Sequence, residues 1–160
     1  MSPPDFLAYF ERVRGRTRKV AALIPADRVD WTYKPGAFTL GDLVRHIAVT
    51  ERFMWAENVS GRPSLYRSHG PELAASRDEI LAFLDRMHAE AMSIFSSLTP
   101  ESFAGTCTTP GGSGMPVWKW LRAMIEHEIH HRGQIYLMLS MIGVATPPIF
   151  GLTSEEVRGR

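Results

Sequence analysis

Four long segments with helical periodicity constrain this chain more than any other feature. Apolar residues recur every three or four positions in residues 4–24, 39–60, 76–98 and 116–142, as in helices that bury one face. Pro, Gly and Ser fill the stretches between them, and strand patterns are almost absent. We therefore predict an all-α fold, most simply a four-helix bundle whose connections are longer than the minimum.

The helix ends carry their own signals. Thr39-Leu-Gly-Asp42 and Ser76-Arg-Asp-Glu79 have the pattern of capping boxes at helix starts. Gly143 follows the fourth segment, where a terminating glycine is typical. Residues 106–114 predict a loop or a short extended piece, and residues 153–156 predict one last helical turn.

Composition and charge exclude several classes of protein. The 160 residues, 44% of them hydrophobic, predict one domain spanning 1–160. With 18 Lys and Arg against 17 Asp and Glu, the chain lacks the field that holds nucleic acid or an anionic membrane. Its single cysteine, Cys107, and a start without signal-peptide pattern predict a cytoplasmic protein with no membrane span. A basic cluster is predicted to be solvated helix surface: Arg12, Arg14, Arg16, Arg18 and Lys19.

Three histidines lie where two helices would face each other. His127 and His131 are one turn apart on the margin of the apolar face of the fourth segment, whereas His130 points to the opposite side. His46 takes the same marginal position on the second segment, with Thr50 and Glu57 further along that strip. Thr50, Glu57 and Gln134 are therefore candidates to line a pocket.

Neutral imidazole is a preferred ligand for zinc, nickel and related divalent ions. Three histidine ligands leave a coordination position open, which is typical of catalytic rather than structural zinc. His46, His127 and His131 are thus predicted to bind a metal. His88 is predicted to be a packed, hydrogen-bonded residue, and His69 carries little signal in its loop.

The segment His127-Glu128-Ile129-His130-His131 also matches the H-E-x-x-H pattern of zinc proteases. The extended protease motif needs a glycine and a histidine where this chain has Gln134 and Leu137. No sheet edge is predicted to hold a peptide, so the protease interpretation is disfavoured. The protease interpretation predicts that Glu128→Gln abolishes peptide cleavage.

Glu128 projects near the middle of the apolar face and needs a partner if buried. Arg132, four residues later, is one candidate to pair with it. The alternative is that Glu128 accepts the free N–H of a ligating imidazole. The sequence leaves both open.

Several stretches together resemble one known family. They are residues 38–46 (FTLGDLVRH), residues 125–134 (IEHEIHHRGQ), Gly143 with Pro147-Pro148, Trp31, Pro35 and the tail 151–157. The chain resembles the DinB/YfiT-like metal-binding four-helix bundles. That resemblance implies that His46, His127 and His131 bind a divalent metal.

Members with assigned activities use low-molecular-weight thiols, as bacillithiol S-transferases or a mycothiol-dependent isomerase. The resemblance therefore implies a metal-dependent thiol S-transferase, or a related small-molecule detoxification enzyme in a stress response, acting as a homodimer. Residues 61–76 match no feature of this family to which a role can be assigned. The alternative is a non-catalytic dimerising or sensing bundle whose metal is structural or absent.

Overall fold

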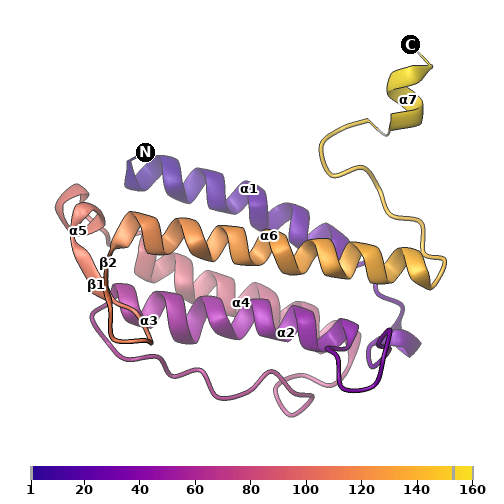
Figure 1. The fold of residues 1–160 in the computed structure, drawn as a ribbon, viewed down its shortest axis with the longest axis horizontal. Helices are drawn as coiled ribbons and strands as arrows, with labels where there is room; N and C mark the ends of the chain where they lie inside the picture. Colours follow the sequence, from indigo (N-terminus) through magenta and orange to yellow (C-terminus); the bar gives the residue numbers. More distant parts are fainter. Residues whose placement is uncertain (1, 153, 160) are drawn as a thin grey trace.

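Each of the four periodic segments is helical in the computed structural model, which describes residues 2–152 and 154–159. The long helices are α1 (Pro3–Ala21), α2 (Leu40–Thr50), α4 (Arg77–Phe95) and α6 (Val117–Met141). They lie side by side as a four-helix bundle, which confirms the predicted fold class (Figure 1). None of the helices in the described ranges is both long and apolar enough to cross a bilayer.

Short elements fill the connections. They are η1 (Ala26–Arg28), η2 (Glu51–Trp55), α3 (Ala56–Val59), α5 (Pro100–Ala104), β1 (Thr106–Thr108), β2 (Gly114–Pro116) and α7 (Ser154–Arg158). β1 and β2 pair antiparallel, with Cys107 opposite Met115, where the sequence predicted a loop or an extended piece. The predicted last turn corresponds to α7, although Thr153 lies outside the described residues.

Side-chain caps explain where the helices begin. Thr39 and Asp42 form the predicted capping box of α2, and Ser76 and Glu79 form that of α4. Gly143 has a φ of +77° just after α6, a left-handed conformation that glycine adopts without steric strain. Both predicted boxes and the predicted stop of the fourth helix are thus confirmed.

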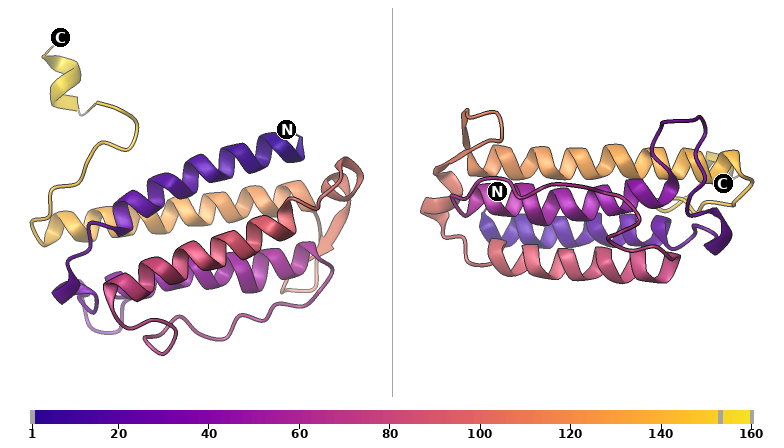
Figure 2. Two further views of the ribbon diagram at one scale, coloured as in Figure 1. Left: turned by 180° about the vertical axis from the view of Figure 1, so that it is seen from behind. Right: turned by 90° about the horizontal axis from the view of Figure 1, so that it is seen from below.

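The helices follow an order that the chain alone does not suggest. α1 packs against α6 and α4, and α2 packs against α4 and α6, so the consecutive helices α1 and α2 lie diagonally across the bundle. α2 and α4 run in the same direction, as do α1 and α6 (Figure 1). Residues 61–76 must therefore return along the whole bundle, beside α2 (Figure 2).

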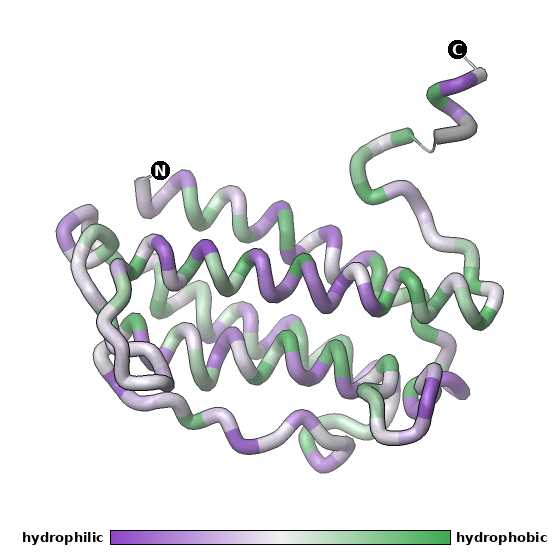
Figure 3. The backbone as a smooth tube through the Cα atoms, in the orientation of Figure 1, coloured by the Kyte–Doolittle hydropathy of each residue, from purple (hydrophilic) through white to green (hydrophobic). Residues whose placement is uncertain are grey.

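In the part of the chain that the structure describes, the core consists of two apolar clusters with polar residues between them. The cluster nearer the N-terminus of α1 includes Phe6, Phe10, Trp55, Phe95 and Leu121. The cluster toward the opposite end includes Val20, Leu43, Ile47, Leu84 and Leu139. Between them lies a buried polar layer, which we define as Arg14, Glu51, His88 and Glu128. The hydrophilic colour in the middle of α6 marks the same level of the bundle (Figure 3).

One member of this layer corrects a sequence prediction. Arg14 was expected with its basic neighbours on solvated surface, but its side chain is buried and only 4% of the residue is exposed. It forms ion pairs with Glu51 and with Glu128. Two carboxylates from other helices offset the cost of burying this guanidinium, and no pattern within the first segment predicts them.

Candidate metal centre

Three histidine side chains from two neighbouring helices meet at one point. Nε2 of His127, on α6, lies 3.1 Å from Nε2 of His46, on α2. It also lies 3.1 Å from Nε2 of His131, one turn further along α6. Each of the three residues offers a ligand atom, and these atoms all lie within 4.8 Å of one another. The structure thus brings together the three residues that the sequence selected.

The helices explain this convergence. α2 and α6 pack directly against each other, so the margins of their apolar faces share one seam of the bundle. The spacing of four residues places His127 and His131 on the same side of α6. His130 is exposed, as predicted.

Burial keeps the three imidazoles neutral at neutral pH. Desolvation, together with the nearby His131 and His127, lowers the pKa of His46 to about 3. Desolvation, together with the nearby His131 and His130, lowers the pKa of His127 to about 4. Desolvation also lowers the pKa of His131, although its hydrogen bond to Gln134 acts in the opposite direction. Neutral imidazole is the form that binds a metal ion.

The hydrogen bonds of His131 show which of its nitrogens is free. Its Nδ1 lies 2.7 Å from Oε1 of Gln134, and a carbonyl oxygen can only accept. Nδ1 therefore carries the hydrogen, and the lone pair of Nε2 points to the shared centre. His127 Nε2 faces two other ring nitrogens but has at most one hydrogen to donate. Nitrogen lone pairs therefore accumulate at this point, and a divalent cation fits such a donor set.

His46 is held from the side by two residues that the sequence did not select. Its Nδ1 lies 3.2 Å from the hydroxyl of Tyr66, and that hydroxyl lies 2.8 Å from Nδ1 of His69. Burial raises the pKa of Tyr66, so the phenol keeps its hydrogen at neutral pH. Both residues come from the irregular segment 61–76, where no periodicity indicates which side chains point inward.

A buried arginine holds that segment against α2. Arg45, directly before His46, is only 1% exposed. It donates 2.8 Å hydrogen bonds to the backbone oxygens of His69 and Ala74 and forms an ion pair with Asp42. The same arginine therefore ties the capping box of α2 to the loop that covers His46.

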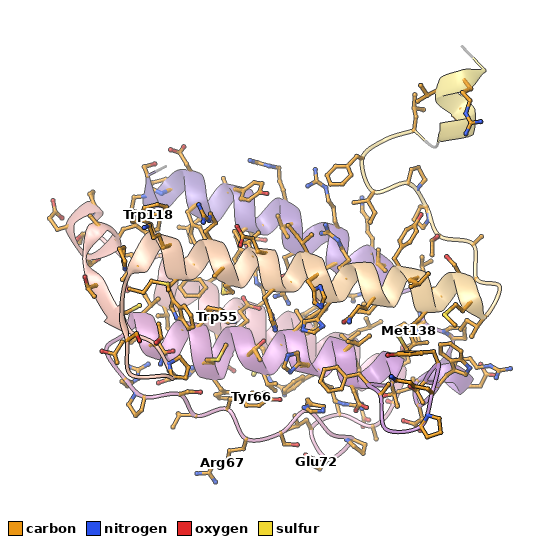
Figure 4. All side chains as sticks on the ribbon, in the orientation of Figure 1. Trp55, Tyr66, Arg67, Glu72, Trp118 and Met138 are labelled. Carbon is orange, nitrogen blue, oxygen red and sulfur yellow. The ribbon has the colours of Figure 1, made fainter. Side chains whose placement is uncertain are left out.

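A groove opens beside the centre. It has a volume of about 570 Å³, and Phe38 and Gln134 belong both to its lining and to the surroundings of the histidines. The ring of Phe38 lies 5.3 Å from that of His46 and 4.5 Å from that of His69. Most of the remaining lining is apolar: Ala37, Leu43, Leu137, Met138 and Met141. Met138 is labelled on α6 in Figure 4.

The other two pocket candidates lie in different surroundings. Thr50 is buried, and its hydroxyl donates to the backbone oxygen of His46 at 2.7 Å. Glu57 is also buried, and Arg52 and Arg62 bind its carboxylate. Of the three predicted lining residues, only Gln134 borders the groove described above.

A pair of tryptophans closes the centre toward the other end of the bundle. The rings of Trp55 and Trp120 are 3.9 Å apart, and Trp55 lies 6.0 Å from the ring of His127. Figure 4 shows Trp55 in the seam between α6 and the helix that continues α2. These rings remove water from one side of the histidines.

Both sequence interpretations of Glu128 need correction. Its Oε2 accepts a 2.9 Å hydrogen bond from Arg14 on α1, and not from Arg132 or from a ligating imidazole. Arg132 instead donates to the backbone oxygen of Val13 at 3.3 Å. A carboxylate bound in this way inside the bundle does not face the histidine cluster as the general base of a zinc protease would.

The fold and the cluster define a class: four-helix bundles with an inward-facing histidine triad. The family model of the DinB superfamily matches residues 9–135, and the chain belongs to that superfamily. No curated protein matches the sequence significantly.

Solved structures share the fold at low sequence identity. A DinB-like protein from Bacillus cereus has 20% identity and a TM-score of 0.79, covering 91% of this chain and 95% of its own. YfiT from Bacillus subtilis, described as a probable metal-dependent hydrolase, has 15% identity and a TM-score of 0.71, with 89% of each chain covered. A mycothiol-dependent maleylpyruvate isomerase has 12% identity and a TM-score of 0.66, covering 84% of this chain and 61% of its own.

Proposed function

We propose that this protein is a metal-dependent thiol S-transferase, or a related enzyme that detoxifies small molecules. His46, His127 and His131 would hold a divalent ion, zinc or nickel. The observation that carries the proposal is the convergence of three neutral imidazole nitrogens within 4.8 Å of one another. With three protein ligands, such an ion would leave a position for an external thiol and would lower the pKa of that thiol toward neutrality.

The chain does not supply a thiol of its own. Cys107 is the single cysteine of the sequence, and it is buried in the hairpin formed by β1 and β2. Burial raises its pKa, and its sulfur contacts the backbone oxygen of Met115. A raised pKa and burial both oppose thiolate reactivity, so the nucleophile must come from a second small molecule.

The remaining tasks belong to residues around the centre. Gln134 contacts Nδ1 of His131, and Tyr66 contacts Nδ1 of His46. These outer nitrogens point away from the centre, so the two contacts orient the imidazole rings. The apolar groove beside Gln134 would take the carbon skeleton of the electrophile, since apolar pockets with a few polar groups are typical of small-molecule sites.

Metal analysis tests the centre. The wild type should bind about one zinc or nickel ion per chain, and His46→Ala and His131→Ala should each lose it, because the site needs all three ligands. His130→Ala, on the exposed side of the same helix turn, is the matched control and should keep the ion. Unchanged metal content in all variants, or none in the wild type, would favour a non-catalytic dimerising or sensing bundle.

A thiol panel tests the reaction. The metal-loaded protein is mixed with a generic electrophile and with bacillithiol, mycothiol, glutathione or coenzyme A. One thiol should be consumed together with the electrophile, and His46→Ala should remove that activity. Consumption of the electrophile without any thiol would instead identify a metal-dependent hydrolase.

The family resemblance also implies a homodimer in the cytoplasm. Light scattering of the purified protein at several concentrations tests the dimer. A monomer at every concentration would leave the metal centre intact as a proposal, because all three ligands come from one chain.

A further inference from the structure

We propose that Tyr66 and His69 are positioning residues for the metal centre. Through a two-step hydrogen-bond chain they hold the hydrogen of His46 on Nδ1, which leaves the lone pair of Nε2 facing the centre. This inference rests on the proposed function, because it assigns the segment 61–76 a role at that same site.

The distances indicate the direction of the chain. A phenol has one hydrogen to donate and can also accept, so Tyr66 can donate to one ring nitrogen and accept from the other. The 2.8 Å contact with His69 has the length typical of a hydroxyl donor, and the 3.2 Å contact with His46 lies at the long end for an N–H donor. Tyr66 then donates to His69 and accepts from Nδ1 of His46.

His131 shows the same arrangement with a different partner. Its Nδ1 donates to Oε1 of Gln134, so its Nε2 also faces the centre with a lone pair. Two of the three ligands are thus oriented through their outer nitrogens, one by a residue on its own helix and one by the loop. Such outer partners of ligating histidines set the tautomer and the ring orientation.

The surroundings make His69 a fixed acceptor. Its backbone oxygen accepts from Nε of the buried Arg45 at 2.8 Å. Its ring packs edge-on against Phe38, with centroids 4.5 Å apart, and lies 5.6 Å from the ring of His46. Figure 4 labels Tyr66 on the loop that follows α3. Because the anchor uses the backbone of residue 69, its side chain can be changed without removing the anchor.

Long-range ¹H–¹⁵N spectra of the metal-free protein at neutral pH test the tautomer directly. The wild type should show His46 with its hydrogen on Nδ1. Tyr66→Phe should shift His46 toward the other tautomer or a mixture, whereas Tyr33→Phe, which removes an exposed phenol, should not. An unchanged His46 spectrum in Tyr66→Phe would overturn the inference.

Cobalt titration tests the consequence for binding. Tyr66→Phe should weaken cobalt affinity about 10- to 100-fold, the range found when outer partners of ligating histidines are removed. His69→Leu should have a similar effect, and His69→Asn should restore much of the affinity because its amide oxygen can replace Nδ1 as acceptor. Equal affinities in all these variants would contradict a positioning role. Failure of the wild type to bind cobalt would count against the proposed function, and the spectra of the metal-free protein would still decide the role of Tyr66.

Discussion

At the scale of single residues, the centre depends on imidazoles that stay uncharged. His46, His127 and His131 are partly or fully buried and lie against one another, so a proton on any of them would be poorly solvated and would repel a second. The buried layer beside them carries formal charges, but Arg14 is paired with Glu51 and Glu128. The ion-paired side chains and the neutral imidazoles are therefore two separate groups at the same level of the bundle.

These lowered pKa values predict a pH dependence of folding. Between pH 6.5 and about 3, His46 binds a proton in the unfolded state that it does not bind in the folded state. The unfolded state then holds more protons, so the free energy of unfolding rises with pH and is lost as the pH falls through this window. In His46→Gln this loss is absent. Urea unfolding in the presence of EDTA measures this effect. As the pH is lowered from about 7 to about 5, the free energy of unfolding of the variant should rise relative to that of the wild type. Parallel pH profiles of the two proteins would contradict the prediction.

The three histidines of the candidate centre could be selected from the sequence, but the residues that contact their Nδ1 atoms could not. His127 and His131 were found because helical spacing shows which side of a helix each residue takes. Tyr66 and His69 belong to a segment without periodicity, so their direction depends on contacts with α2 that only the folded chain contains. Glu128 was assigned the wrong partner because Arg14 lies 114 positions earlier.

At the scale of elements, a π-helical segment explains why the sequence predicted the wrong surroundings for Glu57. Residues 39–60 were read as one α-helix, which places Glu57 on the same margin as His46. The structure instead inserts η2 (Glu51–Trp55), where the chain takes an i to i+5 hydrogen-bond pattern, between α2 and α3. Such a segment changes the direction of every later side chain. Glu57 accordingly meets Arg52 and Arg62, and no 3.6-residue pattern could predict this.

The attachment of segment 61–76 to α2 supports a second prediction. Arg45→Met removes the donor from Asp42 and from the backbone oxygens of His69 and Ala74 while preserving an apolar stem. Leaving these groups unpaired should lower the free energy of unfolding by about 3 kcal/mol, within the range for a broken buried ion pair. Cobalt affinity should also fall, because the loop that orients His46 is released.

Urea unfolding and cobalt titration check this pair of effects. Arg67→Met is the matched control, since Arg67 is exposed on the same loop and points away from the bundle (Figure 4). It should change neither measurement appreciably. A stable Arg45→Met variant with full cobalt affinity would show that the anchor is not needed.

At the scale of the whole molecule, periodicity predicted the four helices but not their order in the bundle. Each helix shows only which of its faces is apolar, and several pairings of such faces can bury the same area. The diagonal placement of α1 and α2 and the parallel run of α2 and α4 depend on how those faces fit together. The site follows from this order, because His46 meets His127 only when α2 and α6 are neighbours.

This assembly predicts that a bound metal stabilises the entire fold. The three proposed ligands come from two helices, His46 and His127 are 81 positions apart along the chain, and the unfolded chain does not hold them together. A ligand that binds only the folded state stabilises it by about 2.7 kcal/mol at a concentration of 100 times Kd. For a chain of this length, that corresponds to a rise in Tm of roughly 5–10 °C.

Thermal unfolding with zinc and then with excess EDTA measures this effect. The wild type should show the rise in Tm with zinc and lose it with EDTA, whereas His46→Ala should show neither change, because two histidines on one helix turn do not link α6 to α2. Equal zinc-dependent shifts in the wild type and in His46→Ala would mean that zinc binds elsewhere on the chain. In that case the triad would be a packed cluster of the bundle and not a metal centre.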